Sequence, residues 1–270
     1  MTKEEIRRKI KSSEIDELRN SIVSKHKTCK GKGFIEILEK HHLTGFPIIK
    51  VEPCRCLKKF NFYSRMILSG VIPERVVNQQ LYKKKVVDKI SFSEVDLISE
   101  IITPCLKKIR KFSRNPYGFL FLGKNGTGKT FIGLKILYHA LASSLTAHCI
   151  NFLDLLKLLR KNFDGEIDLL ISEILDVDIL MIDELGNESV RSDFSISELK
   201  SIIKQRVDRK KPTIIVSNYI YDDFKSIYGA SIESVVEAYF RVFDFNKVVN
   251  VRKARRSAEI DAFFKALKGK

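Results

Sequence analysis

One short segment of the chain has the residue types and the spacing that bind phosphate. Gly123, Gly128, Lys129 and Thr130 fill the pattern G-x-x-x-x-G-K-[ST], and Gly126 lies inside it. In such a loop the glycines let backbone N–H groups turn toward a phosphate, the lysine reaches the β and γ oxygens, and the threonine offers its hydroxyl to Mg²⁺. The pattern therefore predicts a nucleotide-binding loop.

The elements on both sides of this loop favour the same conclusion. The apolar run 119–122 predicts a buried strand before the loop, and apolar residues at helical spacing over 131–141 predict an amphipathic helix after it. A glycine-rich turn that binds nothing would not need this strand–loop–helix arrangement. We expect ATP to be held by Gly123, Asn125, Gly126, Thr127, Gly128, Lys129, Thr130 and Phe131.

Two acidic residues end another apolar run, the segment DILMIDE. Ligands of parallel sheets bind at the carboxyl ends of the strands, which is where Asp183 and Glu184 would lie. We expect Asp183 and Thr130 to hold Mg²⁺, and Glu184 to orient and deprotonate the water that attacks the γ-phosphate. The alternative is a pair of solvated acids that only cap the strand.

A neutral amide follows a third apolar run, PTIIVSNY. Asn218 at the same edge could hydrogen-bond the attacking water or the γ-phosphate without adding charge, so that the site senses a triphosphate. An asparagine after a strand is otherwise a common turn residue.

Strands and helices alternate after the loop, which predicts an α/β fold with a parallel sheet flanked by helices. The expected strands are 148–152, 178–183, 213–217 and 248–251, and the expected helices include 153–162 and 195–209.

Four potential metal ligands lie in two short clusters near the start of the chain. His26 and Cys29 form one pair, Cys54 and Cys56 form the other, and nitrogen and thiolate ligands of this kind suit tetrahedral zinc. The intervening segment 34–49 could be a hairpin or a helix. Free thiols are the alternative interpretation, and His41 or His42 could replace His26 as a ligand.

The composition of the chain also indicates a class of binding partner and a cellular location. The net charge is +16, and residues 1–114 hold twice as many Lys and Arg as Asp and Glu, which favours a polyanion such as nucleic acid over a merely solvated basic surface. The charged first residues, the absence of a long apolar run and the odd count of five cysteines lead us to expect a cytoplasmic protein with reduced thiols and no membrane contact.

The order of the motifs resembles that of the AAA+ ATPases, and specifically the bacterial replicative helicase loaders of the DnaC/DnaI type and their relative, the IstB transposition ATPase. The resemblance lies in GKNGTGKT at 123–130, LMIDELG at 180–186, KQRVDRKKPTIIVSN at 204–218 and RVFDF…VVNVRKARRS at 241–257. The segment HKTC…CRCL, followed by LSGVIPERV, is also similar to the amino-terminal region of several loaders.

This resemblance implies an ATP-hydrolysing AAA+ core whose helical lid is reduced or absent. It also implies self-association through that core, with an arginine of one subunit reaching the γ-phosphate of the next. Arg241 occupies the corresponding region, although Glu237 stands where family members commonly carry a second arginine. Arg206 and the cluster Arg252, Arg255 and Arg256 could also take this role.

The resemblance also suggests domains and partners. We expect a smaller, mainly helical, zinc-binding domain at 1–75 that holds a hexameric replicative helicase, linker helices at 76–115 and the AAA+ domain at 116–270. Single-stranded DNA would lie near Lys157, Arg160 and Lys161. The expected function is ATP-dependent loading of the helicase; the alternatives are an IstB-type helper of a transposase and a non-hydrolysing, ATP-switched module that modulates replication.

Overall fold

The computed structural model describes residues 16–17, 19–24, 26–40, 47–71, 92–161, 168–186, 193–248, 250, 256 and 260. The chain divides into two compact units, Met1–Pro73 and Glu74–Lys270. Within the described ranges, no helix is both long and apolar enough to cross a membrane.

The second unit is built on a parallel sheet, which confirms the predicted fold class. Its strands, as far as the structure describes the chain, are β3 (Gly118–Leu122), β4 (Ala147–Asn151), β5 (Ile179–Leu185), β6 (Thr213–Ser217) and β7 (Phe240–Asp244). They lie in the order β4-β5-β6-β3-β7, and each neighbouring pair is parallel. Strands β3 and β6 are buried along their whole length, as expected of strands that are covered on both faces.

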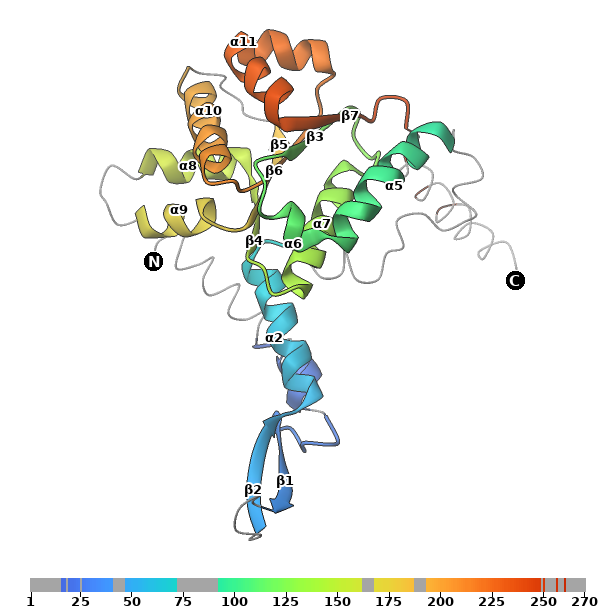
Figure 1. Ribbon diagram of the computed structural model, residues 1–270, viewed down its shortest axis with the longest axis vertical. Helices are drawn as coiled ribbons and strands as arrows, with labels where there is room; N and C mark the ends of the chain where they lie inside the picture. The colour runs from blue at the N-terminus through green and yellow to red at the C-terminus, as the bar shows by residue number, and fades with distance from the viewer. Residues whose placement is uncertain are drawn as a thin grey trace. The chain divides into compact units, whose positions relative to one another are not determined.

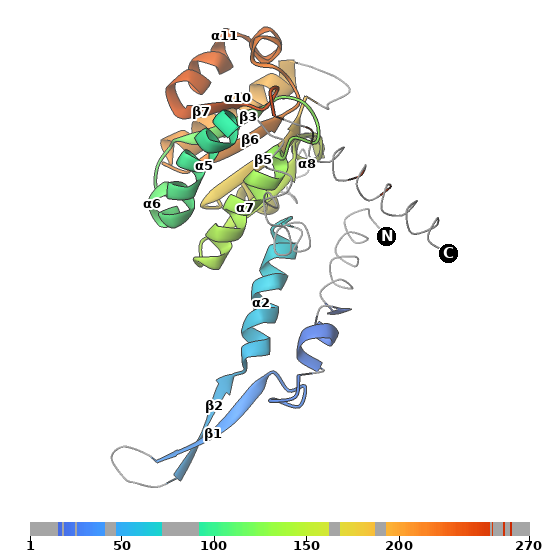
Figure 2. The same cartoon turned by 90° about the vertical axis from the view of Figure 1, so that its right-hand side faces the viewer.

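Helices cover both faces of this sheet (Figures 1 and 2). One face carries α5 (Phe92–Lys107), α6 (Ile109–Phe112) and α7 (Lys129–Ala142), and the other carries α8 (Phe152–Lys161), α9 (Asp168–Leu175) and α10 (Asp193–Asp208). On the second face Leu120, Leu180 and Ile215 of the sheet pack with Leu155 of α8 in one apolar core, and none of these four side chains is exposed. The long helix α11 (Tyr221–Tyr239) contains a kink at Gly229 and leads into β7.

The position of the last strand differs from the sequence-based expectation. The chain forms β7 at Phe240–Asp244, because Phe240 and Phe243 bury their rings while this segment pairs with β3. The chain then turns: the backbone N–H of Asn246 donates to the Asp244 carboxylate at 2.8 Å, and the Val248 N–H donates to the Phe245 carbonyl at 3.1 Å. The prediction of a strand at 248–251 is therefore wrong at Val248 and Asn250, and residues 249 and 251 lie outside the described residues.

The first unit contains a β-hairpin followed by a helix. Strands β1 (Phe34–Lys40) and β2 (Pro47–Pro53) pair in antiparallel register, and α2 (Arg55–Leu68) begins directly after them. Of the two alternatives for 34–49, the structure thus supports the hairpin, with paired strands at 34–40 and from residue 47 on; residues 41–46 lie outside the described residues. A short π-helix, η1 (Asn20–Ser24), contacts α2, and Val23 packs against the buried cysteines at the base of the hairpin.

Candidate functional site

The predicted phosphate loop connects β3 to the N-terminus of α7. Lys129 is only 4% exposed, and its Nζ donates to the carbonyl oxygens of Gly123 at 2.5 Å and Lys124 at 2.8 Å. The hydroxyl of Thr127 donates to the same Lys124 carbonyl at 2.9 Å. The loop backbone is therefore folded around the ammonium group at the start of a helix, an arrangement that suits an anion.

The structure brings Thr130 and Asp183 together, although they are far apart in the sequence. The Thr130 hydroxyl donates to the Asp183 carboxylate at 3.3 Å, and the backbone N–H of Glu184 donates to the same oxygen at 2.9 Å. Burial raises the pKa of Asp183 and the Glu184 charge adds to this rise, while these hydrogen bonds and Lys129 act in the opposite direction. The Thr130 hydroxyl and the Asp183 carboxylate are both oxygen ligands, and a nearby cation would favour the ionised form of Asp183. The pair therefore fits Mg²⁺.

Glu184 is exposed and lies beside a polar residue that the sequence patterns did not indicate. Asn151, at the end of β4, donates from Nδ2 to the Glu184 carboxylate, and its Oδ1 accepts the Leu153 N–H at 2.9 Å. Glu184 itself has a φ of 57°, in the left-handed region. A polar residue at the end of a predicted strand was the available signal, since all five strand ends meet at this edge.

Asn218 follows β6, the strand that lies between β3 and β5. Its neighbours join the two sides of the site: the Ser217 hydroxyl donates to the Leu185 carbonyl at 2.7 Å, and the Tyr219 carbonyl accepts the Gly123 N–H at 2.8 Å. The half-buried Asn218 is thus held at the edge between the phosphate loop and the acidic pair.

The structure does not bring Arg241 to this site. Arg241 lies at the start of β7 and pairs with Phe119, so that about 13 Å of strand separates it from the loop at Gly123. Its side chain is exposed and lines an apolar cavity of about 380 Å³ together with Tyr117 and Cys105. Any contact of Arg241 with a γ-phosphate would therefore involve another subunit.

Arg206 is excluded from that role. It is 1% exposed, and its guanidinium donates to the carbonyls of Leu175, Val177 and Pro212 and to the Thr213 hydroxyl, at 2.6 to 3.0 Å. A guanidinium that is buried and makes four hydrogen bonds inside its own subunit cannot reach a neighbour. In the arginine cluster near the end of the chain, Arg256 is exposed, whereas Arg252 and Arg255 lie outside the described residues.

The basic residues of α8 make contacts of their own. Lys157 pairs with Asp154 at 3.1 Å, and the Arg160 guanidinium lies 5.3 Å from the centre of the Phe194 ring. The Lys157 side chain remains 59% exposed, so this ion pair adds little stability and leaves the ammonium accessible to a phosphate. The side chain of Lys161 is not among those described.

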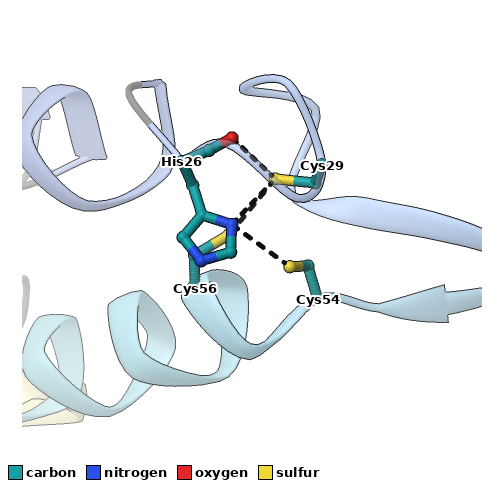
Figure 3. A group of neighbouring side chains, drawn as sticks. All are labelled: His26, Cys29, Cys54 and Cys56. Carbon is teal, nitrogen blue, oxygen red and sulfur yellow. Dashed lines mark hydrogen bonds between the residues drawn. The ribbon is translucent and has the colours of Figure 1, made fainter.

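The four predicted zinc ligands form one cluster in the first unit (Figure 3). Their ligand atoms all lie within 4.8 Å of one another. The Sγ atoms of Cys29 and Cys56 are 3.4 Å apart, and the Nδ1 of His26 is 3.6 Å from the Sγ of Cys29 and 3.5 Å from that of Cys54. The edges of a tetrahedron around zinc with Zn–S bonds of about 2.3 Å have nearly this length, about 3.8 Å.

The chemistry of this cluster also fits a cation. Burial opposes charge on Cys29, but hydrogen bonds from the Gly33 N–H, Cys56 and His26 lower its pKa to about 6. Burial raises the pKa of Cys56 to about 12, and the adjacent thiols Cys29 and Cys54 contribute to this rise. Three buried sulfurs this close can all become thiolates only beside a positive charge, which Zn²⁺ would supply.

Comparisons with known proteins agree with this geometry. Residues 74–253 match the model of a family described as IstB-like ATP binding protein. The replicative helicase loader DnaC of Buchnera aphidicola subsp. Baizongia pistaciae is 27% identical over 125 residues, which cover 45% of this chain and 50% of the loader. The ATP-binding protein of insertion sequence IS5376 from Geobacillus stearothermophilus is 26% identical over 155 residues, or 55% of this chain and 59% of that protein.

A crystal structure of the DnaC helicase loader has the same fold. It superimposes with a TM-score of 0.50 at 21% identity and covers 56% of this chain and 90% of the solved chain. This chain spans about half the length of the curated DnaC loader that it matches. Because the family match extends over two thirds of the sequence and includes the phosphate loop and both acids, the chain belongs to the IstB-like ATP binding proteins, which are AAA+ ATPases of the DnaC/IstB type.

Proposed function

We propose that this protein is an ATP-dependent loader that places a replicative DNA helicase onto single-stranded DNA during the initiation of replication. The observation that carries the proposal is the similarity of its ATP-binding core to proteins that are themselves named replicative helicase loaders. The His/Cys cluster lies in the first unit, ahead of residue 74, where the family match begins. We assign the helicase contact to this unit.

The proposed site divides ATP hydrolysis among four positions. The loop N–H groups and Lys129 would bind the phosphates, and Thr130 with Asp183 would hold Mg²⁺, which would neutralise charge on the phosphates. Glu184 accepts the proton of the attacking water once it leaves Asn151, and Asn218 orients that water from the neighbouring strand.

Self-association would complete the site. Arg241 is exposed at the end of the strand away from its own loop, which supports its assignment to the nucleotide of a second subunit. A guanidinium at that position would stabilise the charge on the transferred phosphoryl group. ATP would then hold the subunits together, and hydrolysis would release them.

Single-stranded DNA is assigned to the surface of α8. Lys157 offers an accessible ammonium group there, and Arg160, which lies over an aromatic ring, offers a guanidinium beside a stacking surface.

The proposal is tested by loading purified helicase onto circular single-stranded DNA. Wild-type protein with ATP should increase the amount of helicase bound to the circles, and Lys129→Ala should abolish the increase, because removing the ammonium weakens phosphate binding by about 10- to 150-fold. Helicase loading that is equal with and without the wild-type protein would contradict a loader function.

A second candidate is an ATPase that assists a DNA transposase. It is favoured by the family match and by the similarity to the ATP-binding protein of an insertion sequence. This candidate predicts ATP-dependent assembly on duplex DNA and binding to a transposase, and it provides no role for the cysteine cluster.

A further inference from the structure

The chain returns to the phosphate loop after β7. The Phe245 N–H donates to the Leu122 carbonyl at 2.8 Å, and Phe245 and Val248 are both buried. A Cβ atom on Gly123 would lie 2.8 Å from the backbone nitrogen of Asn246, so the two backbones are in direct contact. The backbone at Phe245 and Asn246 therefore supports the loop from the side of the edge strand.

Asn250 makes the most specific of these contacts. Its Nδ2 donates to the carbonyl oxygen of Asn125, in the middle of the loop, at 2.9 Å. Its Oδ1 lies against the next residue, where a Cβ atom on Gly126 would be only 2.4 Å away. Gly126 has a φ of +80°, a conformation that favours glycine, and any larger residue there would also displace the Asn250 side chain.

The direction of this hydrogen bond has a consequence for phosphate binding. In a trans peptide the carbonyl of one residue and the N–H of the next point in opposite directions. Since the Asn125 carbonyl points toward Asn250, the Gly126 N–H points away from it. No described peptide bond is cis, so this relation holds for the loop.

We propose that Asn250 is a positioning residue for ATP binding: it holds the Asn125–Gly126 peptide so that the Gly126 N–H faces the phosphates. This inference rests on nucleotide binding at the loop. Without the hydrogen bond the peptide can rotate, because glycine occupies positive and negative φ about equally well. The N–H is then available to the phosphate for only part of the time.

The test compares three full-length variants by titration with a fluorescent ADP analogue and by steady-state ATP hydrolysis. Asn250→Ala should weaken ADP binding and raise the KM for ATP by about three- to tenfold, the effect of one hydrogen bond, with kcat changed less than twofold. Asn250→Asp keeps the shape of the side chain but cannot donate when ionised, so its affinity should fall at least as far. Lys247→Gln makes the same change in charge at an exposed position of the same segment and should bind like the wild type.

A second comparison tests the contact with Gly126. Gly126→Ala should weaken ADP binding less in an Asn250→Ala background than in the wild type, because the atom that its Cβ meets is gone.

Wild-type affinity in Asn250→Asp, or strictly additive effects of Gly126→Ala and Asn250→Ala, would overturn the positioning role and leave the proposed ATPase intact. Absence of ADP binding to the wild type would overturn the proposed ATP-driven function together with this inference.

Discussion

Asp183 and Glu184 are adjacent in the sequence, yet their surroundings differ. Asp183 is partly buried beside the Thr130 hydroxyl, and its pKa is raised mainly by that burial. Glu184 is exposed and hydrogen-bonded to Asn151. This difference is the physical reason for assigning the metal to Asp183 and proton transfer to Glu184.

Removal of the proposed base should separate ATP binding from hydrolysis. Glu184→Gln should bind ATP as the wild type does, and its kcat should fall by about 100-fold or more, because general-base catalysis contributes about that much. Glu173→Gln, an exposed change on α9, is the matched control. Hydrolysis by Glu184→Gln at more than about a tenth of the wild-type rate, measured by phosphate release, would exclude Glu184 as the base.

Asp183→Asn should make the metal-free protein more stable at pH 7. Because the folded-state pKa of Asp183 is raised, the folded state binds a proton more tightly than the unfolded state, and ionisation of this group costs stability as pH rises through the two pKa values. The amide removes this cost, so Tm should rise at pH 7, and the difference from the wild type should vanish below about pH 4. A lower Tm for Asp183→Asn at pH 7 would contradict this account. The same variant should lose Mg²⁺-dependent hydrolysis.

Site residues that belong to recognisable motifs could be predicted, whereas single residues outside any motif that folding brings to them could not. The loop and the acidic pair each form a contiguous pattern, so their residues were evident from the sequence. Asn151 and Asn250 contact them from 33 and 125 residues away. No spacing rule relates positions so far apart, and an isolated asparagine after a strand is also a common turn residue.

Helix α10 packs on the sheet through buried apolar side chains such as Leu199 and Ile202, and it also buries the side chain of Arg206. Its hydrogen bonds reach the end of α9, the start of β5 and the start of β6. Arg206 therefore connects three elements, and its burial lowers its pKa to about 10.

Replacing Arg206 should destabilise the second unit. Arg206→Met leaves buried carbonyl groups without donors and should lower the free energy of unfolding by about 2 to 4 kcal/mol. The control is Arg209→Met, which removes an exposed ion pair to Asp176 and should cost less than about 1 kcal/mol. Urea denaturation of both variants measures the difference; equal effects would mean that the buried hydrogen bonds contribute little.

The stability of the hairpin and α2 should depend on bound zinc. We expect about one zinc per chain in protein purified without added metal, and its loss in Cys54→Ser, because the cluster supplies four ligands. Zinc should dissociate as pH falls, since protons compete for the thiolates and the imidazole. Metal analysis of the protein at decreasing pH measures both effects, and Cys149→Ser in the second unit is the control. Retention of zinc by Cys54→Ser would exclude this ligand set.

The elements of the second unit could be predicted better than those of the first. Buried parallel strands are uniformly apolar, so β3, β5 and β6 were evident, whereas β7 was predicted several residues too late. An edge strand is half exposed and mixes arginine and aspartate with its phenylalanines, while the run at 248–251 is more apolar. In the first unit, alternating residues at 34–49 are compatible with either a hairpin or a helix until the pairing of β1 with β2 is known.

At the scale of the whole molecule, the two units are stabilised in different ways. The second has an extensive apolar core on both faces of a sheet and matches a known family. Among the described residues of the first unit, the cluster at the base of the hairpin is small and three of its four buried residues are cysteines, so a metal would supply stability to it. The predicted boundaries at 75 and 115 and the assignment of the helicase contact to residues 1–75 remain predictions.

Capture of the partner from a lysate of the host tests the central proposal most directly. Tagged Glu184→Gln protein should bind ATP without hydrolysing it and so remain bound to its partner. The double variant Cys54→Ser/Cys56→Ser is the control for the first unit. We predict that mass spectrometry identifies the replicative helicase with Glu184→Gln and that the double variant, which retains nucleotide binding, fails to capture it. Capture of a transposase without helicase would contradict the loader function and would identify the protein as a transposition ATPase.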